Sequence, residues 1–272
     1  MTDDRPIGVF DSGMGGLTVL RALRELLPRE SLVYLGDTAR LPYGTKSPQT
    51  VSRYAHQASA HLTAYGVKLV VVACNTASAL ALDEVQATLA DLPVVGVVRP
   101  GADAAARRSV TGRIAVLSTE STARHGAYER EITRLRPDAS VASRGCSLFV
   151  ALAEEGWSRG PIAEAVAREY LVDLMEEHEP DCVVLGCTHF PVLTEAIASV
   201  VGPDVAIVDS AATTAAVVRQ ELSARGLEFA GPARDPGLRL LATDSPERFL
   251  RVAARFLPAA LLPDSVELVD LA

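Results

Sequence analysis

Short, uninterrupted apolar runs alternate with longer amphipathic stretches along the whole chain, and this alternation restricts the fold more than any other feature. Runs that are apolar at every position are typical of strands buried on both faces of a parallel sheet. We predict such strands at residues 7–10, 32–35, 69–73, 94–98, 114–118, 182–186, 206–208 and 238–242. Because helical patterns separate these runs, the sequence predicts βαβ units and a doubly wound α/β architecture.

Several of the predicted helices have recognisable ends. Ser47 followed by Pro48 is typical of a helix start, and Gly66 is typical of a helix end before the next strand. Further helices are predicted at residues 18–28, 161–178, 211–225 and 246–257.

Two sequence segments recur at nearly the same offset. IGVFDS at 7–12 resembles IAVLST at 114–119, and VVVACNT at 70–76 resembles VVLGCTH at 183–189. Such a long period indicates a duplicated domain, although chance similarity between apolar strands is the alternative. We therefore expect two similar lobes related by a pseudo-twofold axis, with the active site between them. The predicted division is 1–98 plus 209–272 for the first lobe and 99–208 for the second, with the tail packed back on the first.

Composition excludes several classes of protein. With 49% hydrophobic and 22% charged residues, the chain can bury a sizeable core. Its net charge of −8 argues against a nucleic-acid groove. No apolar run reaches the ~18 residues of a membrane span, and residues 1–5 (MTDDR) contain charged side chains, whereas a signal peptide would not be expected to begin this way. We therefore expect a cytoplasmic protein with reduced cysteines, no membrane partner and no nucleic-acid partner.

The four cysteines fall into two kinds. They form no CxxC pair and no histidine lies at zinc-finger spacing, so we expect no metal site. Cys74 and Cys187 each end an apolar strand, where ligands bind in open parallel sheets, and a following helix is expected to lower the pKa of such a thiol. Cys146 and Cys182 lack this context, and we expect them to be packing residues.

Polar loops follow the first two predicted strands. Residues 11–16 (DSGMGG) form a glycine-rich turn suited to a carboxylate or phosphate, but not the GxGxxG of a dinucleotide site. Asp11 within it is expected either to cap the following helix or to bind an ammonium group. In the second loop, Pro42 and Gly44 predict a turn in which Tyr43 is a hinge or a packing anchor.

Two matched thiols facing one crevice favour a particular chemistry. One thiolate can remove a proton from a stereocentre while the other thiol returns a proton on the opposite face. Backbone and side-chain donors after each cysteine would hold the charge that develops on a carboxylate. The sequence thus indicates two-base racemisation. A cysteine-nucleophile hydrolase and a two-lobed binding protein without activity are the alternatives.

The motifs resemble those of the glutamate racemases, a branch of the cofactor-independent aspartate/glutamate racemase family. The resemblance rests on DSGMGGLT at 11–18, GDT at 36–38, PYG at 42–44, ACNTAS at 73–78 and LGCTHFP at 185–191. It implies interconversion of L- and D-glutamate for peptidoglycan synthesis, no cofactor, and a homodimer. An aspartate racemase of the same superfamily is the alternative.

The same resemblance implies roles for individual residues. Cys74 and Cys187 would be the acid/base catalysts for the D- and L-enantiomer, with Asp11 supporting Cys74, and Glu154 and His189 assisting Cys187. The implied substrate-site residues are Asp11, Ser12, Tyr43, Gly44, Asn75, Thr76, Thr119, Thr188 and His189.

The chain departs from the family pattern around some of these positions. Cys146-Ser147 replaces a usual cysteine–proline step, which leaves Glu155 open as an alternative to Glu154. The segment STEST at 118–122 lacks a common glycine, so Thr122 stays open beside Thr119. Both glutamates lie on a predicted helix, where a solvated face is the alternative to a functional role.

Overall fold

The computed structural model, which describes residues 3–89, 91–232, 236–262 and 265–271, contains two parallel sheets. In the first sheet the strand order is β10-β9-β2-β1-β3-β4 and every pairing is parallel. Its strands are β1 (Ile7–Asp11), β2 (Leu32–Gly36), β3 (Leu69–Val72), β4 (Val94–Gly96), β9 (Leu238–Ala242) and β10 (Glu267–Leu268).

The second sheet repeats the neighbour order of the first. Its order β6-β5-β7-β8 matches β2-β1-β3-β4 strand for strand, and its pairings are also parallel. Its strands are β5 (Arg113–Ser118), β6 (Ser140–Gly145), β7 (Cys182–Gly186) and β8 (Ala206–Asp209). The two repeated sequence segments therefore occupy equivalent strands, β1 with β5 and β3 with β7.

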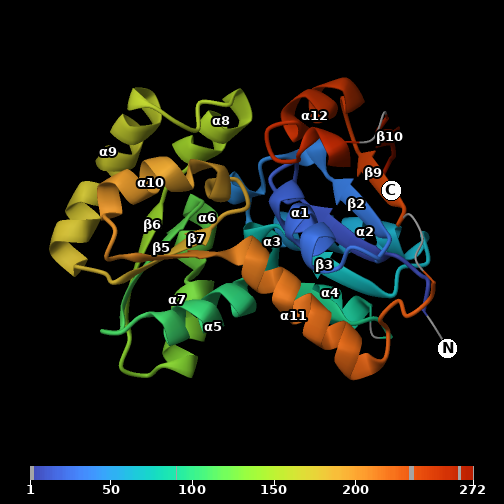
Figure 1. Ribbon diagram of the computed structural model, residues 1–272, viewed down its shortest axis with the longest axis horizontal. Helices are drawn as coiled ribbons and strands as arrows, with labels where there is room; N and C mark the ends of the chain where they lie inside the picture. Colours follow the sequence, from blue (N-terminus) through green and yellow to red (C-terminus); the bar gives the residue numbers. More distant parts are fainter. Residues whose placement is uncertain (1–2, 90, 233–235, 263–264, 272) are drawn as a thin grey trace.

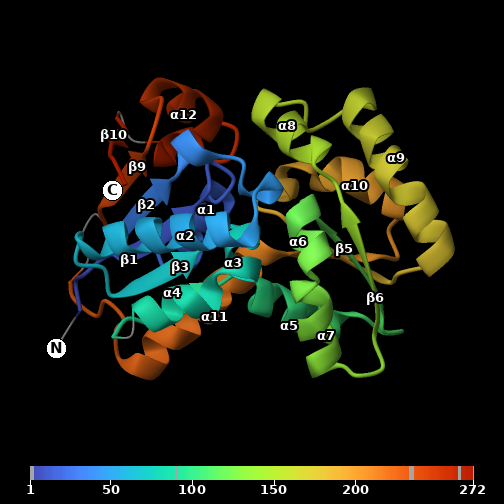
Figure 2. The same ribbon diagram turned by 180° about the vertical axis from the view of Figure 1, so that it is seen from behind.

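Helices cover both sheets and give the molecule two lobes (Figures 1 and 2). On the first sheet lie α1 (Leu17–Leu26), α2 (Pro48–Thr63), α3 (Asn75–Leu80), α4 (Leu82–Thr88), α11 (Ser210–Arg225) and α12 (Pro246–Ala253). On the second lie α5 (Val98–Arg108), α6 (Glu120–His125), α7 (Ala127–Leu135), α8 (Leu148–Glu155), α9 (Pro161–His178) and α10 (Thr194–Val201). We call these two assemblies the first lobe and the second lobe.

Short 3-10 turns join some of these elements. They are η1 (Thr38–Arg40) and η2 (Tyr43–Thr45) after β2, η3 (Phe190–Leu193) after β7, and η4 (Ala259–Leu261) after α12.

The predicted α/β architecture with two lobes is confirmed, and every predicted strand forms. The start of α2 also behaves as predicted, because Ser47 Oγ accepts a hydrogen bond from Thr50 N at 3.3 Å and Pro48 occupies the first turn. Gly66 beyond its end has a φ of 65°, a left-handed value that favours glycine. The strand predicted at 94–98 ends at Gly96 instead, because Val98 already begins α5.

The C-terminal tail returns to the first lobe, as predicted. After β8, the long helix α11 begins near the junction of the lobes, runs along the first lobe and packs against α1 (Figure 1). β9 then pairs with β2, from Leu32 opposite Leu238 to Gly36 opposite Ala242. α12 is shorter than the predicted 246–257, and it follows Pro246, which suits the first turn of a helix.

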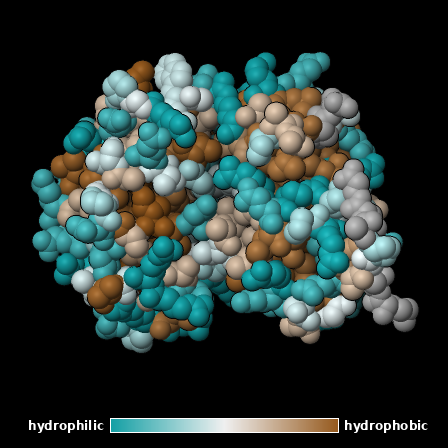
Figure 3. Space-filling view, viewed as in Figure 1, coloured by the Kyte–Doolittle hydropathy of each residue, from teal (hydrophilic) through white to brown (hydrophobic). Residues whose placement is uncertain are grey.

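Apolar side chains from both lobes share one core. The largest buried cluster joins Leu17 and Val71 of the first lobe to Leu185, Phe149 and Phe190 of the second. In Figure 3 hydrophilic side chains cover most of the visible face and apolar ones gather in separate patches. In the part of the chain that the structure describes, no helix is both long and apolar enough to cross a membrane.

Candidate active site

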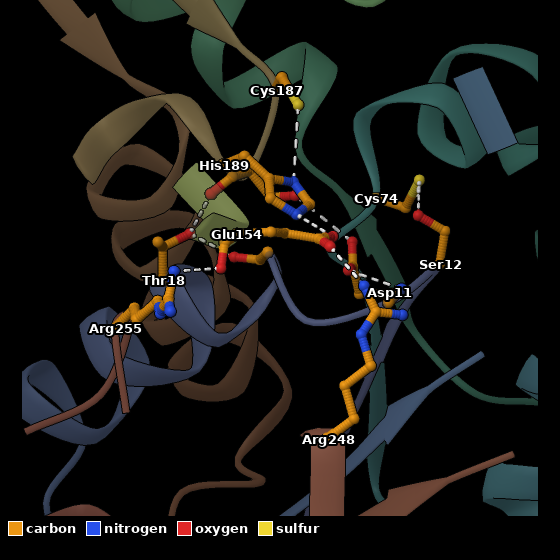
Figure 4. Close-up of polar contacts among 12 residues, drawn as sticks. Asp11, Ser12, Thr18, Cys74, Glu154, Cys187, His189, Arg248 and Arg255 are labelled. Carbon is orange, nitrogen blue, oxygen red and sulfur yellow. Dashed lines mark hydrogen bonds and ion pairs between the residues drawn. The ribbon is translucent and has the colours of Figure 1, made fainter. Parts of the chain in front are cut away.

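The two cysteines singled out in the sequence lie where the lobes meet. Cys74 follows β3 of the first sheet and Cys187 follows β7 of the second, so both stand at the carboxyl ends of equivalent strands. Both residues are buried, with exposures of 5% and 6%. They enter the site from different elements (Figure 4). The sheet topology thus puts one thiol from each lobe at a common site.

The surroundings of Cys74 raise its pKa. Its Sγ lies 3.4 Å from Ser12 Oγ and accepts a hydrogen bond from Ala77 N at 3.5 Å. Burial, followed by the negative charge of Asp11, raises the pKa of Cys74 to about 12 against these hydrogen bonds. The predicted lowering of this pKa by the helix start is wrong, because α3 is short and the burial of the thiol outweighs it.

Cys187 is linked to a histidine and a carboxylate. Its Sγ lies 3.9 Å from His189 Nδ1, and His189 Nε2 lies 3.2 Å from Glu154 Oε1. Burial alone would lower the pKa of His189, but its contacts with Cys187 and Glu154 outweigh that effect and raise the pKa to about 10. The structure thus brings an imidazole, a group able to exchange protons, into direct contact with one of the two thiols.

Glu154, rather than Glu155, faces the site. The Glu154 side chain is only 14% exposed, whereas Glu155 at the end of α8 is exposed. Burial favours the neutral form of Glu154, but His189 and two arginines outweigh it and hold the pKa below its usual value. Of the two glutamates that the sequence left open, the structure thus brings Glu154 to the site, and its side chain does not lie on a solvated face.

Asp11 lies buried at the end of β1. Its Oδ2 accepts a hydrogen bond from Gly13 N at 3.0 Å and its Oδ1 accepts one from Thr188 Oγ1 at 3.5 Å. Burial raises its pKa, against the nearby His189 and the backbone donors of its own loop. Asp11 does not cap α1, whose N-cap is Gly16. It connects the glycine-rich loop of the first lobe to the second lobe instead.

Three threonine hydroxyls, one from the first lobe and two from the second, lie in contact with one another at the site. Thr76 of the first lobe lies 3.1 Å from both Thr119 and Thr122 of the second lobe, and those two are 3.1 Å apart. Thr119 lines the cavity described next, and Thr122 supports it from behind as a buried residue.

Asn75 presents an available donor. Its Oδ1 accepts a hydrogen bond from the Tyr128 hydroxyl at 2.7 Å. Its Nδ2 is buried and, among the described residues, has no hydrogen-bond partner. Because buried donors are rarely left unsatisfied, this amide is suited to an oxygen atom of a ligand. Sequence reasoning missed Tyr128, which lies on α7 without any motif around it.

A cavity of about 270 Å³ opens beside these groups. Its lining includes Ser12, Gly44, Thr119, Glu154 and His189 of the predicted site residues. This volume and its few polar groups suit a small polar ligand.

Tyr43 is a packing anchor and not a wall of this cavity. Its side chain is buried against Phe10 and Tyr54, and its hydroxyl donates to Asp37 Oδ2 at 2.5 Å. A ligand would therefore meet the backbone of this turn rather than the phenol.

The lobes approach so closely that two glycines are required. A Cβ on Gly15 would lie 2.4 Å from His189 Nδ1 and 2.5 Å from Thr188 Oγ1. A Cβ on Gly44 would lie 2.7 Å from Thr119 Cβ. The predicted glycine-rich loop thus serves close contact between lobes.

Cys146 and Cys182 are wholly buried packing residues, as predicted. Burial raises the pKa of each thiol to about 12. Among the residues described, no group of three or more His, Cys, Asp or Glu side chains could hold a metal ion.

Comparisons with known proteins agree with this arrangement. The sequence profile of the Asp/Glu/hydantoin racemase family matches residues 7–218. A glutamate racemase from Geobacter metallireducens is 48% identical over 258 residues, which are 94% of each chain. One from Chlorobaculum tepidum is 43% identical and covers 100% of this chain and 98% of its own.

The fold is similar to that of solved glutamate racemases. The Francisella tularensis enzyme in complex with D-glutamate has a TM-score of 0.91 and 37% identity, and the match covers 99% of this chain and 98% of that one. The Thermus thermophilus enzyme in complex with β-chloro-D-alanine has a TM-score of 0.88 and 42% identity, over 100% and 99% of the two chains. The chain therefore belongs to the Asp/Glu/hydantoin racemase family and groups there with the glutamate racemases.

Proposed function

We propose that the protein is a glutamate racemase that interconverts L- and D-glutamate by two-base proton transfer at Cα. The observation that carries this proposal is the pair of buried thiols, Cys74 and Cys187, supplied by equivalent strands of two lobes. One thiolate takes the Cα proton and the opposite thiol donates its own proton to the other face of the carbon. After one turnover the protonation states of the two sulfurs are exchanged.

Burial suits these thiols to the task. A thiol whose pKa is raised, as that of Cys74 is, becomes a stronger base once it loses its proton, and the Cα proton is only weakly acidic. We assign Cys74 to the D-enantiomer and Cys187 to the L-enantiomer. His189, held by Glu154, exchanges a proton with Cys187 through their 3.9 Å contact. No added cofactor takes part in this scheme.

The remaining polar groups bind the substrate. The Asn75 amide, the hydroxyls of Thr76 and Thr119, and backbone donors after each cysteine hold the substrate carboxylates, where negative charge develops. Asp11, Ser12 and Thr188 face the ammonium group and support Cys74. Tyr43 and Gly44 contribute backbone groups to the substrate site.

Membership of this family supports a proposal about the wider setting of the enzyme. We propose that the enzyme supplies D-glutamate for peptidoglycan synthesis in the cytoplasm and acts as a homodimer. We also propose the lobe boundaries 1–98 plus 209–272 and 99–208, related by a pseudo-twofold axis.

Racemisation in D₂O without added cofactor tests the proposal. Either enantiomer of glutamate should lose optical rotation and gain deuterium at Cα, while aspartate is turned over far more slowly. Cys74→Ala and Cys187→Ala should each abolish racemisation, whereas Cys146→Ala and Cys182→Ala should retain it. Turnover in either of the first two variants would overturn the two-base scheme. A trapped acyl-enzyme would indicate a hydrolase instead, and binding without exchange would indicate a binding protein.

A further inference from the structure

The C-terminal helix of the first lobe contacts the Glu154–His189 pair of the second lobe. Arg248 on α12 lies with its Nη2 3.1 Å from Glu154 Oε2. Arg255, just beyond the helix, donates from Nη1 to the Glu154 backbone carbonyl. Figure 4 shows both arginines directed at Glu154 from the side opposite Cys187.

α12 is packed against the rest of the first lobe, so the positions of Arg248 and Arg255 are set by that lobe. Phe249, Val252 and Ala253 form its buried face, and Phe249 packs on Tyr34 of β2 with ring centroids 6.0 Å apart. Phe256 after the helix meets the His189 ring edge-on, at 5.5 Å and 90°. The first lobe therefore touches both members of the pair that serves Cys187.

The two oxygens of the Glu154 carboxylate contact different lobes. Its Oε1 faces His189 of its own lobe and its Oε2 faces Arg248 of the other lobe. When both oxygens of a carboxylate accept hydrogen bonds, its orientation is fixed. Hydrogen bonds from charged donors such as arginine are stronger than those between neutral groups. The result is a continuous row of contacts from Arg248 through Glu154 and His189 to Cys187.

The two arginines have different tasks. Arg255 binds a backbone carbonyl at the carboxyl end of α8 and lies over Gly156, where cations are favoured near a helix end. Its loss would disturb the helix itself. Among the described residues, the hydrogen bond and ion pair of Arg248 are with the Glu154 carboxylate, and its side chain is 48% exposed, so we expect its replacement to leave the fold intact.

We propose that Arg248 is a positioning residue that holds the Glu154 carboxylate toward His189, so that a side chain of the first lobe assists proton transfer at Cys187 in the second. This inference rests on the proposed racemase function. Arg248 acts through Glu154 and contacts neither thiol. A residue of α12 in the first lobe would thus orient a carboxylate of the second lobe.

The test of this proposal depends on which charged groups face Glu154, because they set its pKa. Among the described residues these are His189, Arg248 and Arg255. Removal of the Arg248 charge should raise the pKa of Glu154, so that the acid limb of kcat/KM moves to higher pH. For a half-exposed pair we expect a shift of about half a pH unit. At neutral pH Glu154 is ionised with or without this shift, and kcat should fall roughly 3- to 10-fold there because the carboxylate is no longer held in one orientation toward His189.

A graded series measures this effect on the full-length enzyme. Racemisation of glutamate is followed by circular dichroism from pH 3.5 to 8, a range that spans the lowered pKa of Glu154, for Arg248→Lys, Arg248→Gln and Arg248→Glu. We expect the acid limb to be nearly that of the wild type in the lysine variant, shifted in the glutamine variant and shifted most in the glutamate variant. Arg251→Glu, an equal charge change at an exposed position of the same helix, is the matched control.

Each outcome decides the question. An acid limb unchanged across the series, or one shifted equally by Arg251→Glu, would overturn the assignment of Arg248. A rise in KM with an unchanged pH profile would mean that Arg248 binds the substrate instead. If the wild-type enzyme itself fails to racemise glutamate, the proposed function is wrong, and that result is distinct from a failure of the series.

Discussion

Gly15 offers a direct test of how closely the lobes must approach. Gly15→Ala adds one methyl group at the point where the glycine-rich loop of the first lobe meets His189 and Thr188 of the second. The backbone of Gly15 is not left-handed, so alanine itself introduces no backbone strain. The substitution thus changes the interface and little else.

The expected size of the effect comes from the contact distances. The new Cβ would lie 2.4 Å from His189 Nδ1 and 2.5 Å from Thr188 Oγ1, whereas ordinary contacts begin near 3.4 Å. The lobes must separate by about 1 Å or the imidazole must leave Cys187, and a misplacement of that size costs about 10²-fold in rate. The free energy of unfolding should fall by about 1–3 kcal/mol, the usual cost of an overpacked contact, so the folded enzyme can still be assayed.

The assay compares glutamate racemisation, followed by circular dichroism, with urea unfolding of the same preparations. Gly237→Ala is the control, because a Cβ there meets only Ser31 Oγ, at 3.8 Å. It should behave like the wild type in both measurements. A Gly15→Ala enzyme with wild-type activity would refute the inference that the lobes close this tightly in catalysis.

Two further predictions concern stability. The pKa of Cys74 is raised from 9.0 to about 12 by burial, so its contribution to stability is complete below pH 9 and is lost as the pH rises toward 12. The urea midpoint should therefore fall above pH 9, and a constant midpoint would contradict the burial argument. Lys68 is fully buried, 2.6 Å from Glu30 Oε2. Lys68→Met leaves that carboxylate unpaired and should cost about 3–5 kcal/mol of unfolding free energy, whereas Lys68→Met combined with Glu30→Gln should recover part of the loss.

The strands and thiols could be predicted from the sequence because their signals are local. A central parallel strand such as β7 is apolar throughout, and the residues after it stand at the ligand-binding edge of the sheet. β6 was missed because it is an edge strand, and its sequence SVASRG contains only two apolar residues. β10 was missed because two residues are too short to form a pattern.

Contacts between segments that are far apart in the sequence could not be predicted, because no local sequence pattern marks them. Arg248 lies on an amphipathic helix where an arginine is ordinarily solvated, and only the folded chain brings it to Glu154. The pKa of Cys74 was predicted in the wrong direction for a related reason. The helix start is visible in the sequence, whereas the depth of burial at a lobe interface is not.

The two thiols have unlike neighbours, a hydroxyl beside Cys74 and an imidazole–carboxylate pair beside Cys187. The two enantiomers of an amino acid have equal free energies in water, so kcat/KM of a racemase must be the same in both directions. Unlike neighbours can therefore make the two directions differ only in how that common ratio is divided between kcat and KM. The enantiomer that saturates the enzyme at lower concentration must also be the one that turns over more slowly, whichever thiol begins the reaction.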